Sequence, residues 1–165
     1  MYTLQIVIVL CGLFAAFSHP QINVKKSESC EDHPSPQSYH IHVLFWQNNV
    51  NSTKAAISLQ DNFLTKFGLT RENNTCTFEP GDDPADGSLC VFTTDYVPAG
   101  PFLTAQTAIY VPIADYERTV SWTVQRRGIL DVFVHPNSGC TVDDHLHSGV
   151  WSGQRWEVDP SIFFD

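Results

Sequence analysis

Tyr39-His40-Ile41-His42-Val43-Leu44-Phe45-Trp46 is the stretch of sequence that decides the fold. Side chains along a β-strand alternate between the two faces of the sheet. Ile41, Val43 and Phe45 therefore share one face, which is entirely apolar, and the two histidines lie on the other face with Leu44 and Trp46. We expect a strand that packs its apolar face against a hydrophobic core.

The remaining elements follow from the same kind of periodicity. Apolar residues recur at helical spacing over residues 52–67 and 113–127, and a glycine that can end the helix follows each run. Three runs with the composition of strands span residues 89–96, 104–111 and 130–135. The order strand, helix, strand, strand, helix, strand is that of the split βαβ arrangement. We therefore predict an α+β fold, a ferredoxin-like split βαβ sandwich (βαββαβ), in a single domain with two disulfides.

The histidines are expected on the sheet face that the helices leave open. In this fold both helices cover one face, so the apolar strand faces lie beneath them. The last strand alternates in the same way, with His135 on the face opposite its valines. Because the first and last strands are neighbours, we expect His40, His42 and His135 on one face, with His42 and His135 within reach of one metal ion.

Residues 1–18 have the character of a signal peptide. The run from Leu4 to Phe17 is apolar and uncharged, and Ala16-Phe17-Ser18 supplies the pattern of a cleavage site. The run is shorter than the about 20 residues of a membrane span, so a retained anchor is the less favoured alternative. We expect a secreted, extracellular protein with no membrane span after processing. It would have an extended N-terminal arm, residues 19–38, and a folded domain, residues 39–165.

The cysteines agree with export. Four remain after cleavage, an even set that is typical of an oxidising compartment and that allows three pairings. Cys76 and Cys90 bracket a polar insertion rich in turn residues, so we pair them and leave Cys30 with Cys140. Two sequons provide candidate N-glycosylation sites at Asn51 and Asn73.

The charge argues against one class of partner. The formal net charge of −9 lies entirely outside residues 1–18. Phosphate backbones would repel such an acidic protein, and no basic aromatic patch offsets the repulsion, so no nucleic-acid partner is expected.

Five of the seven histidines fall in three clusters, namely His40 with His42, His135, and His145 with His147. Imidazole binds iron, copper and zinc, and a strand-borne His-x-His pair places both rings on one face. The clusters therefore have the spacing of a metal site. The alternative, which the residues leave open, is that one or two of these histidines only satisfy hydrogen bonds on a half-buried face. The pair Asp143-Asp144 could supply or support a ligand, although a solvated turn is the commoner role of such a pair.

Five motifs in order along the chain resemble the successive signatures of the DOPA 4,5-dioxygenase family, over about residues 39–158. They are Tyr39-His40-Ile41-His42-Val43, Arg127-Gly128-Ile129-Leu130, His135-Pro136-Asn137-Ser138-Gly139, Asp144-His145 and Trp151-Ser152-Gly153. The resemblance implies a small ferredoxin-like protein that cleaves the ring of L-DOPA or a related catechol beside a hydroxyl. Its cofactor would be non-haem Fe(II), and its partners a small phenolic or catechol ligand and O₂.

The matched motifs also imply site residues. The expected iron ligands are His42, His135 and His145. Iron held by a few protein ligands keeps open positions, where a catechol and O₂ can bind. The expected acid/base residues, or supports of the ligands, are His40 and His147, since imidazole can transfer protons near neutral pH.

The chain departs from the family pattern at Phe102. Many members have Gly-Pro-His where this chain has Gly100-Pro101-Phe102, and a phenyl ring neither binds metal nor transfers protons. The alternative function is therefore a non-catalytic extracellular binding or structural protein on the same fold. Such a protein could hold a phenolic ligand against Trp46, Phe133 and Tyr110. The oligomeric state stays open, a homodimer included.

Overall fold

The computed structural model describes residues 30, 34–78, 83–84 and 86–163. The predicted signal peptide and most of the predicted N-terminal arm lie outside these residues. Within the part that is described, no helix is both long enough and apolar enough to cross a membrane.

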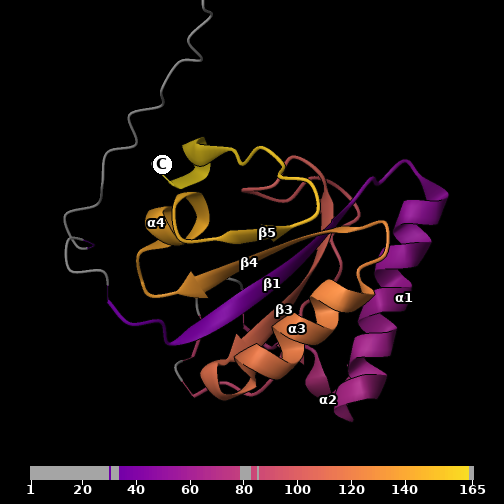
Figure 1. Ribbon diagram of the computed structural model, residues 1–165, viewed down its shortest axis with the longest axis horizontal. Helices are drawn as coiled ribbons and strands as arrows, with labels where there is room; N and C mark the ends of the chain where they lie inside the picture. Colours follow the sequence, from indigo (N-terminus) through magenta and orange to yellow (C-terminus); the bar gives the residue numbers. More distant parts are fainter. Residues whose placement is uncertain (1–29, 31–33, 79–82, 85, 164–165) are drawn as a thin grey trace, which may run out of the picture.

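One antiparallel sheet forms the centre of the domain (Figure 1). Its strand order is β2-β3-β1-β4-β5, so each of the two helical connections joins strands that have another strand between them. This is the split βαβ arrangement with β5 added at one edge, and the predicted α+β fold is confirmed. The strands are β1 (Ser38–Phe45), β2 (Cys90–Val91), β3 (Ala105–Pro112), β4 (Asp131–Asn137) and β5 (Val150–Ser152).

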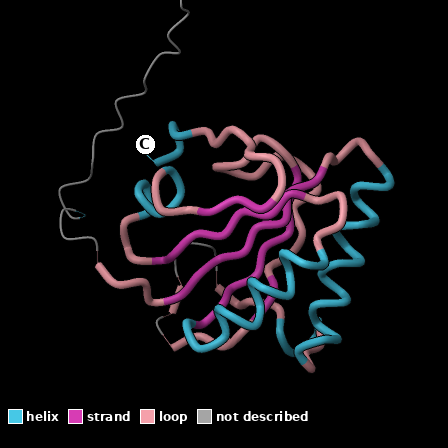
Figure 2. The backbone as a smooth tube through the Cα atoms, viewed as in Figure 1, coloured by secondary structure: helices cyan, strands magenta, loops and turns pink. Residues whose placement is uncertain are grey.

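The two long helices cover one face of this sheet (Figure 2). The first, α1 (Val50–Phe67), begins where the Asn49 side chain accepts hydrogen bonds from two backbone N–H groups. It ends at Gly68, whose φ of 68° lies in the left-handed region that glycine adopts without strain. The second, α3 (Tyr116–Arg126), follows a 3₁₀ turn, η2 (Ile113–Asp115). A short helix, α2 (Arg71–Asn74), follows α1.

The core beneath the helices has the composition predicted from strand alternation. Ile41, Val43 and Phe45 of β1 are each no more than 1% exposed. They pack against apolar residues of β3, of β4 with the residue before it, and of α1. These residues are Ile109, Val111, Leu130, Val132, Val134, Ala56, Leu59 and Phe63. Burial of this apolar surface is the main favourable contribution to folding.

The predicted strand over residues 89–96 is wrong in length. Only Cys90 and Val91 form regular pairs with β3, whereas Asp95 makes an isolated bridge to Gln106. Between these contacts the register slips by one residue, as in a β-bulge, which breaks the ladder.

The face of α3 that packs on the sheet is partly polar. Tyr116 and Val120 contact the core, but the fully buried residues of this helix are Thr119 and Thr123. Their hydroxyls donate to backbone carbonyls one turn earlier, so no buried hydroxyl lacks a partner there.

The opposite sheet face carries further elements that the sequence did not predict. A short helix, α4 (Thr141–Leu146), lies over β4, and a 3₁₀ turn, η3 (Pro160–Phe163), contacts α4. Cys30 pairs with Cys140 at the start of α4, and Cys76 pairs with Cys90, as in the predicted disulfides. Both sequon asparagines, Asn51 and Asn73, are exposed, and their glycosylation stays a prediction.

Candidate metal centre

Three histidines from two neighbouring strands meet on the face opposite α1 and α3. His40 and His42 point to this face because they alternate with the apolar residues of β1, and β4 pairs His135 directly with His40. Their exposed fractions are only 3%, 4% and 1%. One ring nitrogen of each lies within 4.8 Å of those of the other two. The predicted gathering of His42 and His135 therefore corresponds to the geometry of the structure.

The sequence had suggested that the face holding these histidines is open, but other segments of the chain cover it. Residues from α4, from η3, from the long connection between β2 and β3 and from the segment before β2 line a cavity of about 610 Å³ above the sheet. The connections cover this face because they carry apolar and aromatic side chains, among them Phe92, Ile162 and Phe163, that line the cavity. The result is a sheltered pocket with a histidine floor.

The position of the proton on His42 follows from its neighbours. Its Nδ1 lies 2.7 Å from Oε1 of Gln106, and the amide nitrogen of Gln106 donates to Asp95 and to the Ala99 carbonyl. Because these two groups are acceptors, the Gln106 oxygen must face His42 and accept the proton on Nδ1. Nε2 of neutral His42 then carries a lone pair.

His135 has the same arrangement. Its Nδ1 lies 2.8 Å from the carbonyl oxygen of Pro136, which can only accept, so Nδ1 carries the proton and Nε2 the lone pair. Nε2 of His135 lies 3.1 Å from Nε2 of His42. Two lone pairs thus face each other at hydrogen-bond distance with no proton of their own between them.

A metal ion bound by both nitrogens would account for this arrangement. Bonds from a metal to imidazole nitrogen are about 2 Å long, so two nitrogens bound to one ion at a right angle lie about 3 Å apart. The observed 3.1 Å has this spacing. Hydrogen bonds from the far ring nitrogen to an acceptor are the usual way in which proteins orient metal-binding histidines. The donor set therefore fits a transition metal.

Burial keeps these rings neutral. Desolvation is the largest cause that lowers the pKa of His42 and of His135 well below 6.5, and neighbouring histidines lower both further. Neutral imidazole is the form that binds a metal, so the cavity keeps its ligands ready at neutral pH.

His145, which the family resemblance implied as a ligand, lies beside the group of three. Its ring centroid is 3.9 Å from that of His135 but 6.4 Å from that of His42. Its Nδ1 lies 2.9 Å from the Thr141 carbonyl, which leaves Nε2 as an acceptor, and burial lowers its pKa to about 4. The structure thus places His40, expected to act in acid/base chemistry, among the three histidines whose ring nitrogens lie within 4.8 Å of one another, with His145 beside His135.

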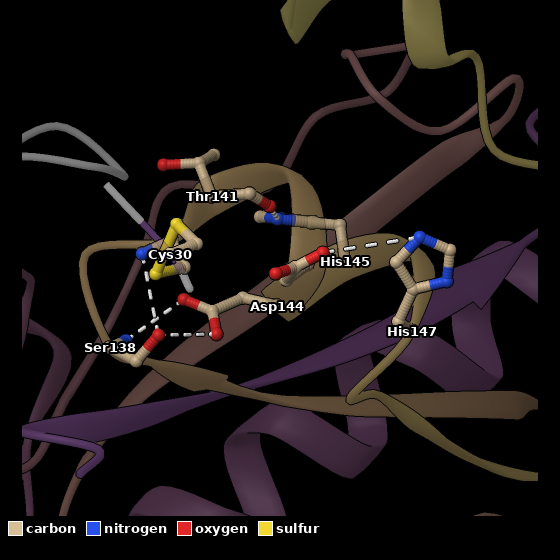
Figure 3. The surroundings of a disulfide bond; sticks show 8 residues. Cys30, Ser138, Thr141, Asp144, His145 and His147 are labelled. Carbon is tan, nitrogen blue, oxygen red and sulfur yellow. Dashed lines mark hydrogen bonds and ion pairs between the residues drawn. A yellow bond between two sulfur atoms is a disulfide. The ribbon is translucent and has the colours of Figure 1, made fainter. Parts of the chain in front are cut away.

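The residues around α4 have mostly structural contacts (Figure 3). Asp144 accepts hydrogen bonds from the backbone N–H and hydroxyl of Ser138 and holds the turn beside the Cys30 disulfide. His147 has a side chain that is 58% exposed, it lies 4.0 Å from Asp143, and it is not among the residues that line the cavity. One carboxylate oxygen of Asp143 is buried with no hydrogen-bond partner among the described residues.

Phe102 occupies the place where the family pattern has a histidine. It is 1% exposed, and its ring centroid lies 4.7 Å from that of His42 and 5.7 Å from that of Phe133. The aromatic platform suggested for a phenolic ligand does not form. Trp46 lies against Trp156, Phe133 is buried, the Tyr110 hydroxyl donates to Pro84, and none of the three lines the cavity.

Two contacts of the histidines were not predicted from the sequence, those with Gln106 and with Asp83. Asp83 reaches Nε2 of His40 at 2.7 Å. The alternation of β3 placed Gln106 on the histidine face and could have suggested the first contact. No local pattern indicates the second, because it spans 43 residues.

Comparison with known proteins is consistent with this site. The sequence profile of the Dopa 4,5-dioxygenase family matches residues 39–162. A DOPA 4,5-dioxygenase from Amanita muscaria is 26% identical over 123 residues, which make up 74% of this chain and 48% of that protein. The chain thus spans about half the length of this curated relative.

A solved structure shares the fold. A crystal structure from Nostoc punctiforme, provisionally described as a dioxygenase, superposes with a TM-score of 0.59 at 19% identity. The match covers 78% of this chain and 91% of the other chain.

Proposed function

The chain belongs to the Dopa 4,5-dioxygenase family, and from this premise we propose that it is a secreted, iron-dependent extradiol dioxygenase that cleaves the ring of L-DOPA or a related catechol. The observation that carries the proposal is the pair of Nε2 lone pairs, on His42 and His135, that face each other at 3.1 Å on the floor of a sheltered cavity. Export is supported by the apolar N-terminal stretch and by the two disulfides.

The metal would be held by His40, His42 and His135, with His145 beside them. Bound ferrous iron would supply the redox chemistry that O₂ needs and a positive charge that attracts the catechol oxygens. Nε2 of His145 would accept a hydrogen bond from a catechol hydroxyl. The apolar side chains around the cavity, such as Phe92 and Phe163, would exclude water from the ring.

The direct test is turnover by the mature protein. It is loaded with Fe(II) under anaerobic conditions, mixed with L-DOPA or another catechol, and followed with an oxygen electrode and by absorbance of the ring-opened product. We expect oxygen uptake that requires both metal and catechol. A protein that binds iron but consumes no oxygen with any of a panel of catechols would contradict catalysis.

The lowered pKa values predict how metal binding depends on pH. An ordinary imidazole is half protonated near pH 6.5, whereas burial places the pKa of His42 and His135 well below that value. Protons therefore compete less with the metal, and half-release of bound Zn(II) is expected below pH 6.5. Equilibrium dialysis over a pH series, with circular dichroism to follow folding, measures this. Half-release at or above pH 6.5 from folded protein would be inconsistent with the prediction.

Phe102 favours the second candidate, a non-catalytic binding protein on the same fold. Its buried ring next to His42 can neither bind metal nor transfer a proton. The two candidates differ in the response to Phe102→His. If the wild type is inactive and this variant consumes oxygen, the pocket is that of the family and the missing histidine explains the loss. If neither binds iron, the binding protein is the better account.

A further inference from the structure

Asp83 reaches the histidine cluster from the insertion between Cys76 and Cys90. Its Oδ1 lies 2.7 Å from Nε2 of His40, and the side chains of His40 and Asp83 are only 3% and 10% exposed. None of the five sequence motifs contains Asp83, and it is not one of the three residues that form the metal-binding group. It lines the cavity and contacts His40.

Described residues before and after Asp83 in the chain contact the sheet. The Cys76–Cys90 disulfide joins the two ends of the insertion, with the two Cα atoms 5.2 Å apart. Next to Asp83, the carbonyl of Pro84 accepts a 2.6 Å hydrogen bond from the fully buried Tyr110. Gly87 lies so close to the same ring that an added Cβ would approach it to 2.7 Å. Pro84 and Gly87, which follow Asp83, thus lie against Tyr110 of β3.

We propose that Asp83 is a positioning residue for the metal centre, held in place by the disulfide-closed insertion. Its carboxylate accepts the proton of His40 Nε2, fixes the ring orientation, and leaves the lone pair on Nδ1 as the one that a metal can use. The inference rests on the proposed function in one respect, namely that the histidine cluster holds a metal. It assigns this role to a residue outside the matched motifs.

The physical reason is the same as for the other two rings, with a stronger acceptor. His42 and His135 donate Nδ1–H to neutral carbonyl oxygens, whereas His40 donates to a carboxylate. A hydrogen bond to an ionised acceptor is about twice as strong as a neutral one. A carboxylate behind a ligand histidine also raises the basicity of the ring, and loss of such a partner typically weakens metal binding about 10–100-fold.

The test measures Zn(II) affinity, which does not depend on turnover, by competition with a chromophoric chelator. We expect Asp83→Ala to weaken binding about 10–100-fold. Asp83→Asn, which keeps an oxygen acceptor but not the charge, should fall between Asp83→Ala and the wild type. Asp86→Asn is the matched control, because Asp86 lies on the same insertion but is exposed, and it should bind as the wild type does.

A second readout reports the ring directly. Long-range ¹H–¹⁵N correlation spectra of the metal-free protein should show His40 protonated at Nε2 in the wild type. They should show a mixture of tautomers in Asp83→Ala. A His40 protonated at Nδ1 in the wild type would overturn the proposal even if Asp83→Ala binds zinc weakly.

The tether is tested with the double variant Cys76→Ala/Cys90→Ala. It should lose affinity as Asp83→Ala does, and Asp83→Ala added to it should cause little further loss, because the two changes remove the same contact. If Asp83→Ala lowers the Zn(II) affinity of the double variant by as large a factor as it does in the wild type, the role of the disulfide is overturned.

The failures can be told apart. Wild-type affinity in folded Asp83→Ala overturns this inference but leaves the metal centre intact. A wild type that binds no metal overturns the metal centre and this inference together.

Discussion

Replacing His42 with alanine is expected to reduce the affinity for Zn(II) or Fe(II) more than about 100-fold and to abolish any catechol-dependent oxygen uptake. The ring supplies one of the two nitrogens whose lone pairs face each other, so its removal takes away a ligand. Loss of a ligand should cost more than the about 10–100-fold that is typical of the residues behind ligands. His135→Ala should have a similar effect, since it removes the other nitrogen. Chelator competition and an oxygen electrode measure the two quantities.

His147→Ala is the matched control for this substitution. The His147 ring is mostly exposed and lies outside the cavity lining, so the variant should bind metal as the wild type does. Metal affinity that survives in His42→Ala and His135→Ala, or that falls equally in His147→Ala, would contradict the assignment of the site.

The second large effect concerns stability. Phe133→Ala is expected to lower the free energy of unfolding of the metal-free protein by about 3–5 kcal/mol, since it empties a fully buried ring site. The ring is 1% exposed and packs against Trp151 and Phe102, at centroid distances of 4.6 and 5.7 Å. It also lies 5.5 Å from the His135 ring, so metal affinity should fall as well.

Urea denaturation measures the stability change. Ile129→Ala is the control, because that side chain is 73% exposed and its loss should change the free energy by no more than about 0.5 kcal/mol. A loss below about 1 kcal/mol in Phe133→Ala would show that the ring is not part of a packed layer beneath the cavity.

Much of the fold could be predicted from residue periodicity. Strand alternation placed Ile41 and Val43 in the core and His42 on the other face, and the structure agrees. Such patterns are informative because each residue's face follows from its own position in the strand. The short β2, the buried threonines of α3, and the elements α4 and β5 depend on tertiary packing, which local patterns do not encode.

The strand-borne part of the histidine site was also predictable from residue periodicity. The two strands brought His40, His42 and His135 together, because their neighbouring positions follow from the topology. The relative places of His40 and His145 were not predictable, since His145 lies on a helix whose position is set by a disulfide and by turns. Asp83 was missed for a related reason, because it reaches the site through the fold of an insertion.

The central claim, a metal held by these histidines, is tested most directly by X-ray absorption at the metal edge of the loaded wild-type protein. The account predicts at least two imidazole nitrogens at about 2 Å, with the multiple scattering that identifies the rings, and the loss of one ring in His42→Ala. A spectrum with oxygen ligands only, or one that is unchanged in His42→Ala, would contradict it.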